Sequence, residues 1–187
     1  FIDRTFAREK SFFGKGCVAL VSMADPVSPL LAGHVAAAAE AEALTFHRGG
    51  TYLAMEGPQF SSLAESRLYR TWGYDVIGMT NMPEAKLARE AEICYATVAM
   101  VTDYDSWHPD HGSVDIQSII RVLHDNADNA RRLVGRLAQD LPRTHESCPV
   151  GSDTALEYAM MTAPEARDPA LLAKLDAVAG RVLASEA

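Results

Sequence analysis

The chain has 187 residues, 48% of them hydrophobic and 22% charged, so it is long enough to bury a core and has the composition of a globular fold. Seventeen Lys and Arg against 25 Asp and Glu give a formal charge of -8, which argues against a surface that follows nucleic-acid phosphates. No apolar run approaches the roughly 18 residues that span a bilayer. The three cysteines are far apart and form no CxxC pair. We therefore expect a cytoplasmic protein with no nucleic-acid or membrane partner.

Segments of strand length alternate with segments of helical period along the chain. This alternation favours βα units around a mixed or mostly parallel sheet, and thus one α/β domain over residues 1–187. Strands are predicted at residues 16–21, 51–55, 75–79 and 93–101.

Helix start and stop signals mark the predicted helices more clearly than the strands. Ser28-Pro29 offers an N-cap followed by a first-turn proline. Ser62 and Glu65 form a capping box. A long apolar stripe at steps of three and four residues is ended by Pro142. The predicted helices span residues 30–44, 63–71, 84–90, 116–141, 155–161 and a last stretch that begins at 168–169.

Two acidic residues follow the predicted strand 93–101, at a carboxyl end where open α/β sheets hold their ligands. If the chain stays extended, Asp103 and Asp105 point the same way, because strand side chains repeat every two residues. Neighbouring like charges and burial both favour the protonated acid, so one of the two is a candidate proton donor. The alternative is that both are ordinary loop aspartates that cap a helix or face water.

Two further strand ends carry candidate binding residues. Gly57-Pro58 predicts a rigid turn that presents Phe60 as a stacking face and Ser61 as a hydrogen-bonding group for a planar heterocycle. The alternative is that Phe60 staples the next helix into the core. Thr80 and Asn81 stand just before a helix, where free N–H groups suit a phosphate, or one of them is simply the N-cap.

The segment His108-Pro109-Asp110-His111 contains potential metal ligands. It lacks further clustered ligands nearby, so we expect no metal site. Gly14-Lys15-Gly16 is not a P-loop, because Gly16 is followed by Cys17 and not by a Lys-Ser/Thr pair.

Several motifs together resemble the methylthioadenosine phosphorylase branch of the purine nucleoside phosphorylase family, in order and in spacing, over about residues 1–142. They are Glu56-Gly57-Pro58-Gln59-Phe60-Ser61-Ser62 with Ala64-Glu65-Ser66, Arg70-Thr71-Trp72-Gly73, Met79-Thr80 before Pro83-Glu84, and Ala99-Met100-Val101-Thr102-Asp103-Tyr104-Asp105. The resemblance implies a three-layer, phosphorylase/hydrolase-like α/β fold with a central mixed, twisted sheet flanked by helices. It also implies that the family's glycine-rich phosphate-binding turn lies upstream of Phe1, so that the chain alone is expected to be an incomplete, inactive domain.

The resemblance implies phosphorolysis, in which inorganic phosphate as co-substrate attacks C1′ of the ribosyl group while the purine departs. No other cofactor is expected. The implied reaction converts 5′-methylthioadenosine to adenine and 5-methylthioribose 1-phosphate in purine and methionine salvage, in a homotrimer. Two alternatives stay open: a general purine nucleoside phosphorylase acting on adenosine, inosine or guanosine, and a catalytically inactive nucleoside-binding subunit.

The resemblance also implies residue roles. Asp103 would serve N7 of adenine and Asp105 would accept from the 6-amino group, which favours adenine over 6-oxopurines. Where some relatives place a histidine near the 5′ group, this chain has Leu20. The implied substrate-binding residues are Phe60 and Ser61 at the base, Met79 under the ribose, Thr80 on the phosphate, Thr102, and Ile116 and Ile119 around the 5′-methylthio group.

Overall fold

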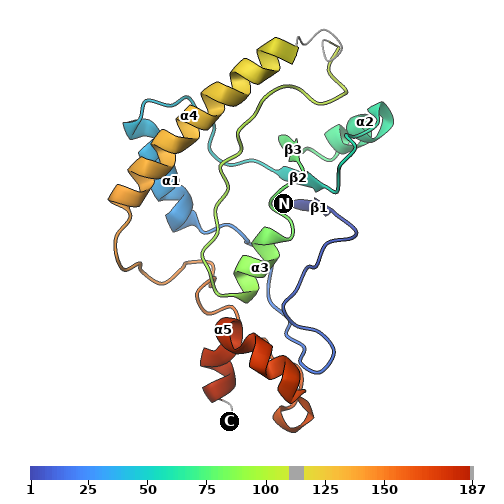
Figure 1. The fold of residues 1–187 in the computed structure, drawn as a ribbon, viewed down its shortest axis with the longest axis vertical. Helices are drawn as coiled ribbons and strands as arrows, with labels where there is room; N and C mark the ends of the chain where they lie inside the picture. The colour runs from blue at the N-terminus through green and yellow to red at the C-terminus, as the bar shows by residue number, and fades with distance from the viewer. Residues whose placement is uncertain (110–115, 186–187) are drawn as a thin grey trace. The chain divides into compact units, whose positions relative to one another are not determined.

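The computed structural model describes residues 1–109 and 116–185 and divides the chain into two units (Figure 1). Unit 1 comprises Phe1–Ala7, Gly33–Thr80 and Val98–Thr144. Unit 2 comprises Arg8–Ala32, Asn81–Thr97 and His145–Ala187. The chain passes between the two units repeatedly. That residues 1–187 act as one domain stays a prediction.

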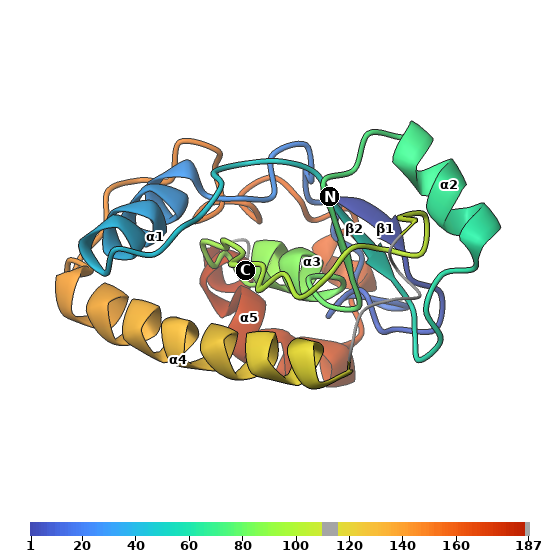
Figure 2. The same ribbon diagram turned by 90° about the horizontal axis from the view of Figure 1, so that it is seen from above.

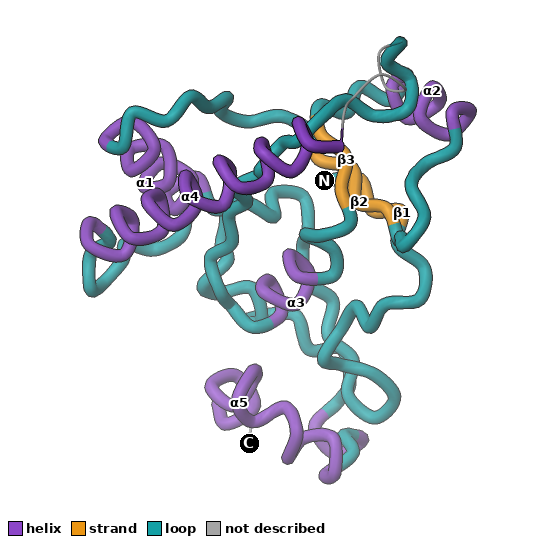
Figure 3. The backbone as a smooth tube through the Cα atoms, turned by 45° about the horizontal axis from the view of Figure 1, so that its top comes forward, coloured by secondary structure: helices purple, strands orange, loops and turns teal. Residues whose placement is uncertain are grey.

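The sheet of unit 1 consists of three parallel strands in the order β1-β2-β3 (Figure 3). They are β1 (Ile2–Arg4), β2 (Tyr52–Met55) and β3 (Val76–Gly78), so the strands expected at 51–55 and 75–79 are confirmed. The central Leu53 pairs with Ile2 on one side and with Ile77 on the other, and its side chain is buried. Because all three strands run the same way, their carboxyl ends lie at one edge of the sheet.

In the described ranges unit 1 contains two whole helices, α2 (Leu63–Thr71) and α4 (Ile116–Asp140), and most of α1 (Pro29–Ala41). α1 and α4 lie side by side in Figure 2. α1 begins after Ser28, whose hydroxyl oxygen accepts from the backbone N–H of Leu31, and α4 ends before Pro142, both as predicted. Alanines of α1 pack against Leu133 of α4 in a small core. The third helix, α2, starts with the predicted capping box of Ser62 and Glu65.

Unit 2 gathers a second core around its last helix. α3 (Glu84–Glu90), the 3-10 turn η2 (Pro164–Ala166) and α5 (Pro169–Ser185) are its regular elements, and α5 starts where the carboxylate of Asp168 accepts from the N–H of Ala170 at 2.8 Å. The buried core residues of this unit are Cys17, Leu156, Ala159, Leu175, Ala179 and Val182.

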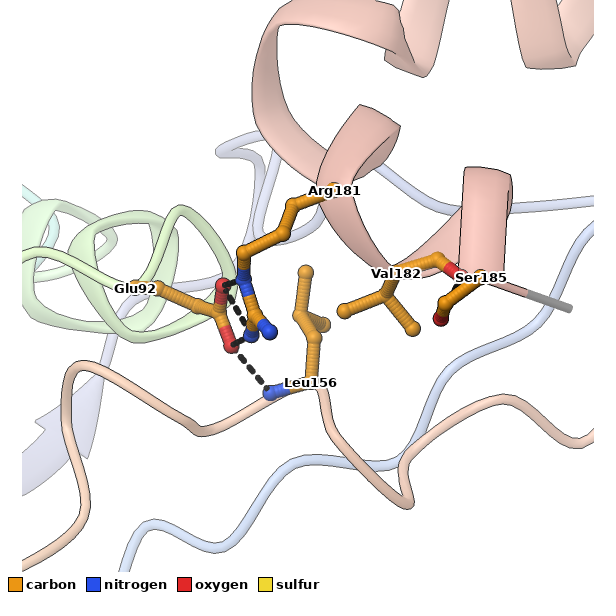
Figure 4. Close-up of polar contacts among 5 residues, drawn as sticks. All are labelled: Glu92, Leu156, Arg181, Val182 and Ser185. Carbon is orange, nitrogen blue, oxygen red and sulfur yellow. Dashed lines mark hydrogen bonds and ion pairs between the residues drawn. The ribbon is translucent and has the colours of Figure 1, made fainter.

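A single carboxylate, that of Glu92, ties three parts of unit 2 together (Figure 4). It accepts from the backbone N–H of Leu156 at 3.0 Å and from the guanidinium of Arg181 on α5 at 2.7 Å. The turn after α3, the 154–160 segment and α5 therefore share one acceptor.

Three predicted elements are wrong. Segment 16–21 forms only isolated bridges, among them Ala19 with Met160, and segment 93–101 forms no ladder with any strand in the described part of the chain. A strand needs a neighbour for its backbone groups, which an apolar sequence does not supply by itself. Segment 155–161 is a series of turns and not a helix, because Met160 leaves the helical path to pair with Ala19.

No helix in the described ranges is long and apolar enough to cross a membrane.

Candidate functional site

Four candidate residues of unit 1 follow the carboxyl ends of two parallel strands: Phe60 and Ser61 come after β2, and Met79 and Thr80 come after β3. Glu56 comes directly after β2, and its carboxylate accepts from the backbone N–H groups of Phe6 at 2.5 Å and Ala7 at 3.4 Å. The segment after β1 is thereby held to the end of β2. This edge is where an open parallel sheet presents loop residues to a ligand.

The turn after β2 lies close to the residue that follows β3. Gly57 has a φ of +72°, and a Cβ placed there would lie 2.6 Å from the sulfur of Met79. Only a glycine fits this left-handed conformation and this close approach without strain. Met79 is thus adjacent to the turn that leads to Phe60 and Ser61.

Phe60 and Ser61 have opposite environments. The ring of Phe60 is 83% exposed, so the interpretation that it staples α2 into the core is wrong and its faces are open for stacking. Ser61 is buried, and its hydroxyl donates to the sulfur of Met55 at the end of β2, 3.6 Å away. The backbone carbonyl of Ser61 accepts from the hydroxyl of Ser106 at 3.2 Å, which links this loop to the segment containing the two aspartates.

Thr80 is paired with a tyrosine of the central strand. Its hydroxyl lies 3.1 Å from the phenol oxygen of Tyr52. The tyrosine ring crosses Gly78, where a Cβ would lie 1.9 Å from the phenol oxygen. Glycine at position 78 therefore makes room for the side chain that contacts Thr80.

Neither Thr80 nor Asn81 caps α3, so that interpretation of the two residues is wrong. The N-cap is Pro83, which makes no side-chain capping hydrogen bond. In unit 2 the amide oxygen of Asn81 accepts from the hydroxyls of Tyr95 at 2.7 Å and Thr97 at 2.8 Å. The side chain of Asn81 is thus engaged in the interior of unit 2, while Thr80 belongs to unit 1.

Asp105 is held by two hydroxyl groups on the same carboxylate oxygen. Ser66 Oγ donates to Asp105 Oδ2 at 2.5 Å, and Tyr74 Oη donates to it at 2.9 Å. Burial raises the pKa of Tyr74 to about 12, with further contributions from its hydrogen bond to Asp105 and from the carboxylate charge. The phenol therefore stays protonated through the neutral range and acts as a donor.

Asp103 has a different environment. The backbone bends at this residue, its side chain is exposed, and its carboxylate accepts from the hydroxyl of Thr102 at 2.6 Å. The condition for the two aspartates to point the same way, an extended backbone, is not met. Their assignment to N7 and to the 6-amino group stays a prediction.

The segment that contains the two aspartates also holds three aromatic rings that contact one another. Tyr104 stacks on His108 with ring centroids 4.1 Å apart, and Arg70 of α2 lies over the ring of Trp107 at 3.8 Å. The backbone N–H of Trp107 donates to Ser66 Oγ at 3.1 Å. This segment is therefore fixed to α2 at several points.

Several other predicted residues lie outside the part of the chain that the structure describes. Asp110 and His111 lie outside the described residues, and the side chains of Ile116 and Ile119 are likewise not described. Within the described ranges no group of three or more His, Cys, Asp or Glu is placed to hold a metal ion. Leu20 belongs to unit 2, where its side chain is 68% exposed and its N–H donates to the carbonyl of Ala159.

Two residues of the site, Ser66 and Tyr74, are not predicted as site residues from the sequence. No sequence motif marks Ser66 as a binding residue within the helical pattern of α2. Its burial is predictable, because it lies three residues before Tyr69 on the same face of the helix. Tyr74 follows a turn and stands 31 residues before Asp105, and no local pattern predicts that pairing.

The sequence profile of the Phosphorylase superfamily matches residues 1–139. The chain belongs to this superfamily. The matched residues include the three strands, α2 and both aspartates, so the α/β fold class expected from the sequence is confirmed.

Curated members of the superfamily resemble the chain closely. S-methyl-5'-thioadenosine phosphorylase of Bradyrhizobium diazoefficiens is 73% identical over 183 residues, which cover 98% of this chain and 63% of that protein. The enzyme of the same name from Cereibacter sphaeroides is 68% identical, again over 98% of this chain and 63% of the relative. The resemblance to the methylthioadenosine phosphorylases is thereby confirmed. The chain spans less than two-thirds of the length of these relatives.

Solved structures of the superfamily agree with the fold. The crystal structure of a methylthioadenosine phosphorylase from an Antarctic soil metagenomic library has a TM-score of 0.83 and 43% identity, covering 95% of this chain and 62% of that one. The methylthioadenosine phosphorylase of Schistosoma mansoni in complex with tubercidin has a TM-score of 0.66 and 26% identity, covering 74% of this chain and 55% of that one.

Proposed function

We propose that this chain carries the purine-binding part of a phosphorylase that converts 5′-methylthioadenosine to adenine and 5-methylthioribose 1-phosphate. The observation that carries the proposal is that the hydroxyls of Ser66 and Tyr74 both donate to Asp105 and fix it as an acceptor. The loop that contains Asp105 is also linked to Ser61, because the hydroxyl of Ser106 donates to the Ser61 carbonyl. The names of the relatives support the same activity. Because the chain spans only part of their length, the activity is proposed for the whole protein.

In the proposed reaction, phosphate attacks C1′ of the sugar and the bond from C1′ to N9 breaks. The electron pair of that bond passes to the purine, and a proton at N7 lets adenine leave without negative charge. Asp103 is the proposed partner of N7. Its carboxylate is exposed and accepts a hydrogen bond from the hydroxyl of Thr102.

The other proposed contacts follow the strand ends. The exposed ring of Phe60 stacks on the base, the loop of Ser61 supplies polar contacts, and Met79 lies under the ribose. Thr80, held by Tyr52, contacts the phosphate. Ile116 and Ile119 are proposed to form an apolar wall around the 5′-methylthio group.

We also propose that the protein works as a cytoplasmic homotrimer in purine and methionine salvage. Inorganic phosphate is the co-substrate, and no metal or organic cofactor takes part. The support for these points is the family resemblance of the motifs around Phe60, Thr80 and Asp105. Light scattering of the full-length protein measures the trimer directly, and a monomer or dimer would contradict it.

The test of the activity is phosphate-dependent release of the base by the full-length protein. We expect adenine from 5′-methylthioadenosine to be released faster than hypoxanthine from inosine, with no turnover when phosphate is omitted. Equal rates for the two substrates would favour the general purine nucleoside phosphorylase. Binding of the nucleoside without any turnover would favour the inactive binding subunit.

A further inference from the structure

The two carboxylate oxygens of Asp105 accept different numbers of hydrogen bonds. Oδ2 accepts from both Ser66 Oγ and Tyr74 Oη, whereas Oδ1 accepts no hydrogen bond from any residue in the described part of the chain. A carboxylate oxygen that already accepts two hydrogen bonds has little capacity for a third. Oδ1 is therefore the oxygen that Asp105 can offer to a ligand.

The direction of both bonds is fixed by their surroundings. The Ser66 side chain is fully buried at 0% exposure, and its oxygen already accepts from the backbone N–H of Trp107 at 3.1 Å. Its proton is then left for Asp105. Tyr74 keeps its proton, because burial and the hydrogen bond to Asp105 raise its pKa to about 12. Both groups thus donate to the same oxygen, which fixes the orientation of the Asp105 carboxylate.

We propose that Ser66 and Tyr74 are positioning residues that orient Asp105 with Oδ1 toward the base as an acceptor, so that the site selects purines with a 6-amino donor and rejects 6-oxopurines. This inference rests on the proposed function and names the source of its base selectivity. A 6-oxo group brings an acceptor toward Oδ1, which leaves two acceptors facing each other without a proton. Among the described residues Asp103 has no such pair of donors, and its carboxylate accepts from the hydroxyl of Thr102.

A purely structural role is the rival explanation. Ser66 joins α2 to the 105–107 segment, so its hydrogen bonds also stabilise the fold of unit 1. A structural role predicts that removing a hydroxyl lowers the activity toward all nucleosides by the same factor. A positioning role predicts that the ratio between adenine and hypoxanthine nucleosides changes. The ratio therefore separates the two explanations.

The experiment compares the full-length wild-type protein with Tyr74→Phe, which removes one hydroxyl and keeps the ring. The readouts are kcat/KM for 5′-methylthioadenosine and 5′-methylthioinosine and the Kd of free adenine and hypoxanthine. We expect the preference for the 6-amino compound to fall about tenfold in both ratios, the size of one hydrogen bond to a charged group.

Ser66→Ala and Tyr158→Phe complete the set. Ser66→Ala should lower the same preference, and its unfolding midpoint shows whether it is folded. Tyr158 lies in unit 2 with its side chain 89% exposed, so Tyr158→Phe is the matched control and should change nothing. A wild-type protein that turns over neither nucleoside contradicts the proposed function. In that case the ratio of the Kd values of adenine and hypoxanthine, compared between the wild-type protein and Tyr74→Phe, still tests the inference. An unchanged base preference in Tyr74→Phe overturns the inference while leaving the activity standing.

Discussion

Gly78→Ala tests whether the central strand positions Thr80. The added Cβ would lie 1.9 Å from the phenol oxygen of Tyr52 and 2.9 Å from its Cζ. The first distance is at least roughly 1.5 Å short of an optimal van der Waals separation, so the ring has to move. Movement on that scale breaks the 3.1 Å contact between Tyr52 and Thr80.

The expected cost in stability follows from the same geometry. Overpacking costs about 1–3 kcal/mol in a packed interior, and we expect the lower half of that range because Tyr52 is only half-buried and can swing outward. The assays are urea unfolding and the KM for phosphate, both on the full-length protein. We expect a lower unfolding midpoint together with a several-fold higher KM for phosphate.

A double-mutant cycle with Tyr52→Phe separates the overlap from the lost hydrogen bond. Tyr52→Phe removes the oxygen that lies 1.9 Å from the new Cβ, so part of the stability lost in Gly78→Ala should return in the double variant. The KM for phosphate should stay raised, because the hydroxyl that contacts Thr80 is absent in either case. Wild-type stability and wild-type KM in Gly78→Ala would refute the reasoning.

Three further predictions concern other parts of the chain. Asp103→Asn should reduce the turnover of adenine nucleosides far more than the affinity for phosphate; intact steady-state turnover would show that Asp103 is not the partner of N7. The free energy of unfolding should fall as the pH rises from about 10 to about 12, because the folded pKa of Tyr74 lies above its ordinary value, and Tyr74→Phe should lack this part of the pH dependence in denaturant titrations. Glu92→Ala should destabilise unit 2 by about 1–3 kcal/mol, because the backbone N–H of Leu156 loses its acceptor. Arg181→Ala should destabilise it less, because the side chain of Arg181 is mostly exposed. Equal effects of the two variants in thermal unfolding would contradict this ranking.

Local signals predicted the elements whose hydrogen bonds are local. The capping box of Ser62 and Glu65 and the cap at Asp168 lie within three residues of their partners, and the structure confirms both. The strands that became β2 and β3 were also predictable, since each is an apolar segment followed by a turn signal.

Elements that depend on distant partners were not predictable in the same way. Segment 93–101 has the composition of a strand, yet a strand exists only where a neighbour accepts and donates its hydrogen bonds. Segment 155–161 has a helical period that is overridden by the pairing of Met160 with Ala19, 141 positions earlier (160 minus 19). Likewise the aspartates could be located from the sequence, but the hydroxyls that distinguish Asp105 from Asp103 come from other parts of unit 1.

The core of unit 2 crosses the boundary at which the superfamily profile ends. The profile stops at residue 139, whereas Cys17 and the residues after it pack against Leu156, Ala159 and Leu175, all of which lie beyond that point. Trimming the chain to its matched part would strip Cys17 of its apolar neighbours and remove the partner of Ala19. A shortened version designed from the family boundary alone would therefore be expected to aggregate through this uncovered apolar surface.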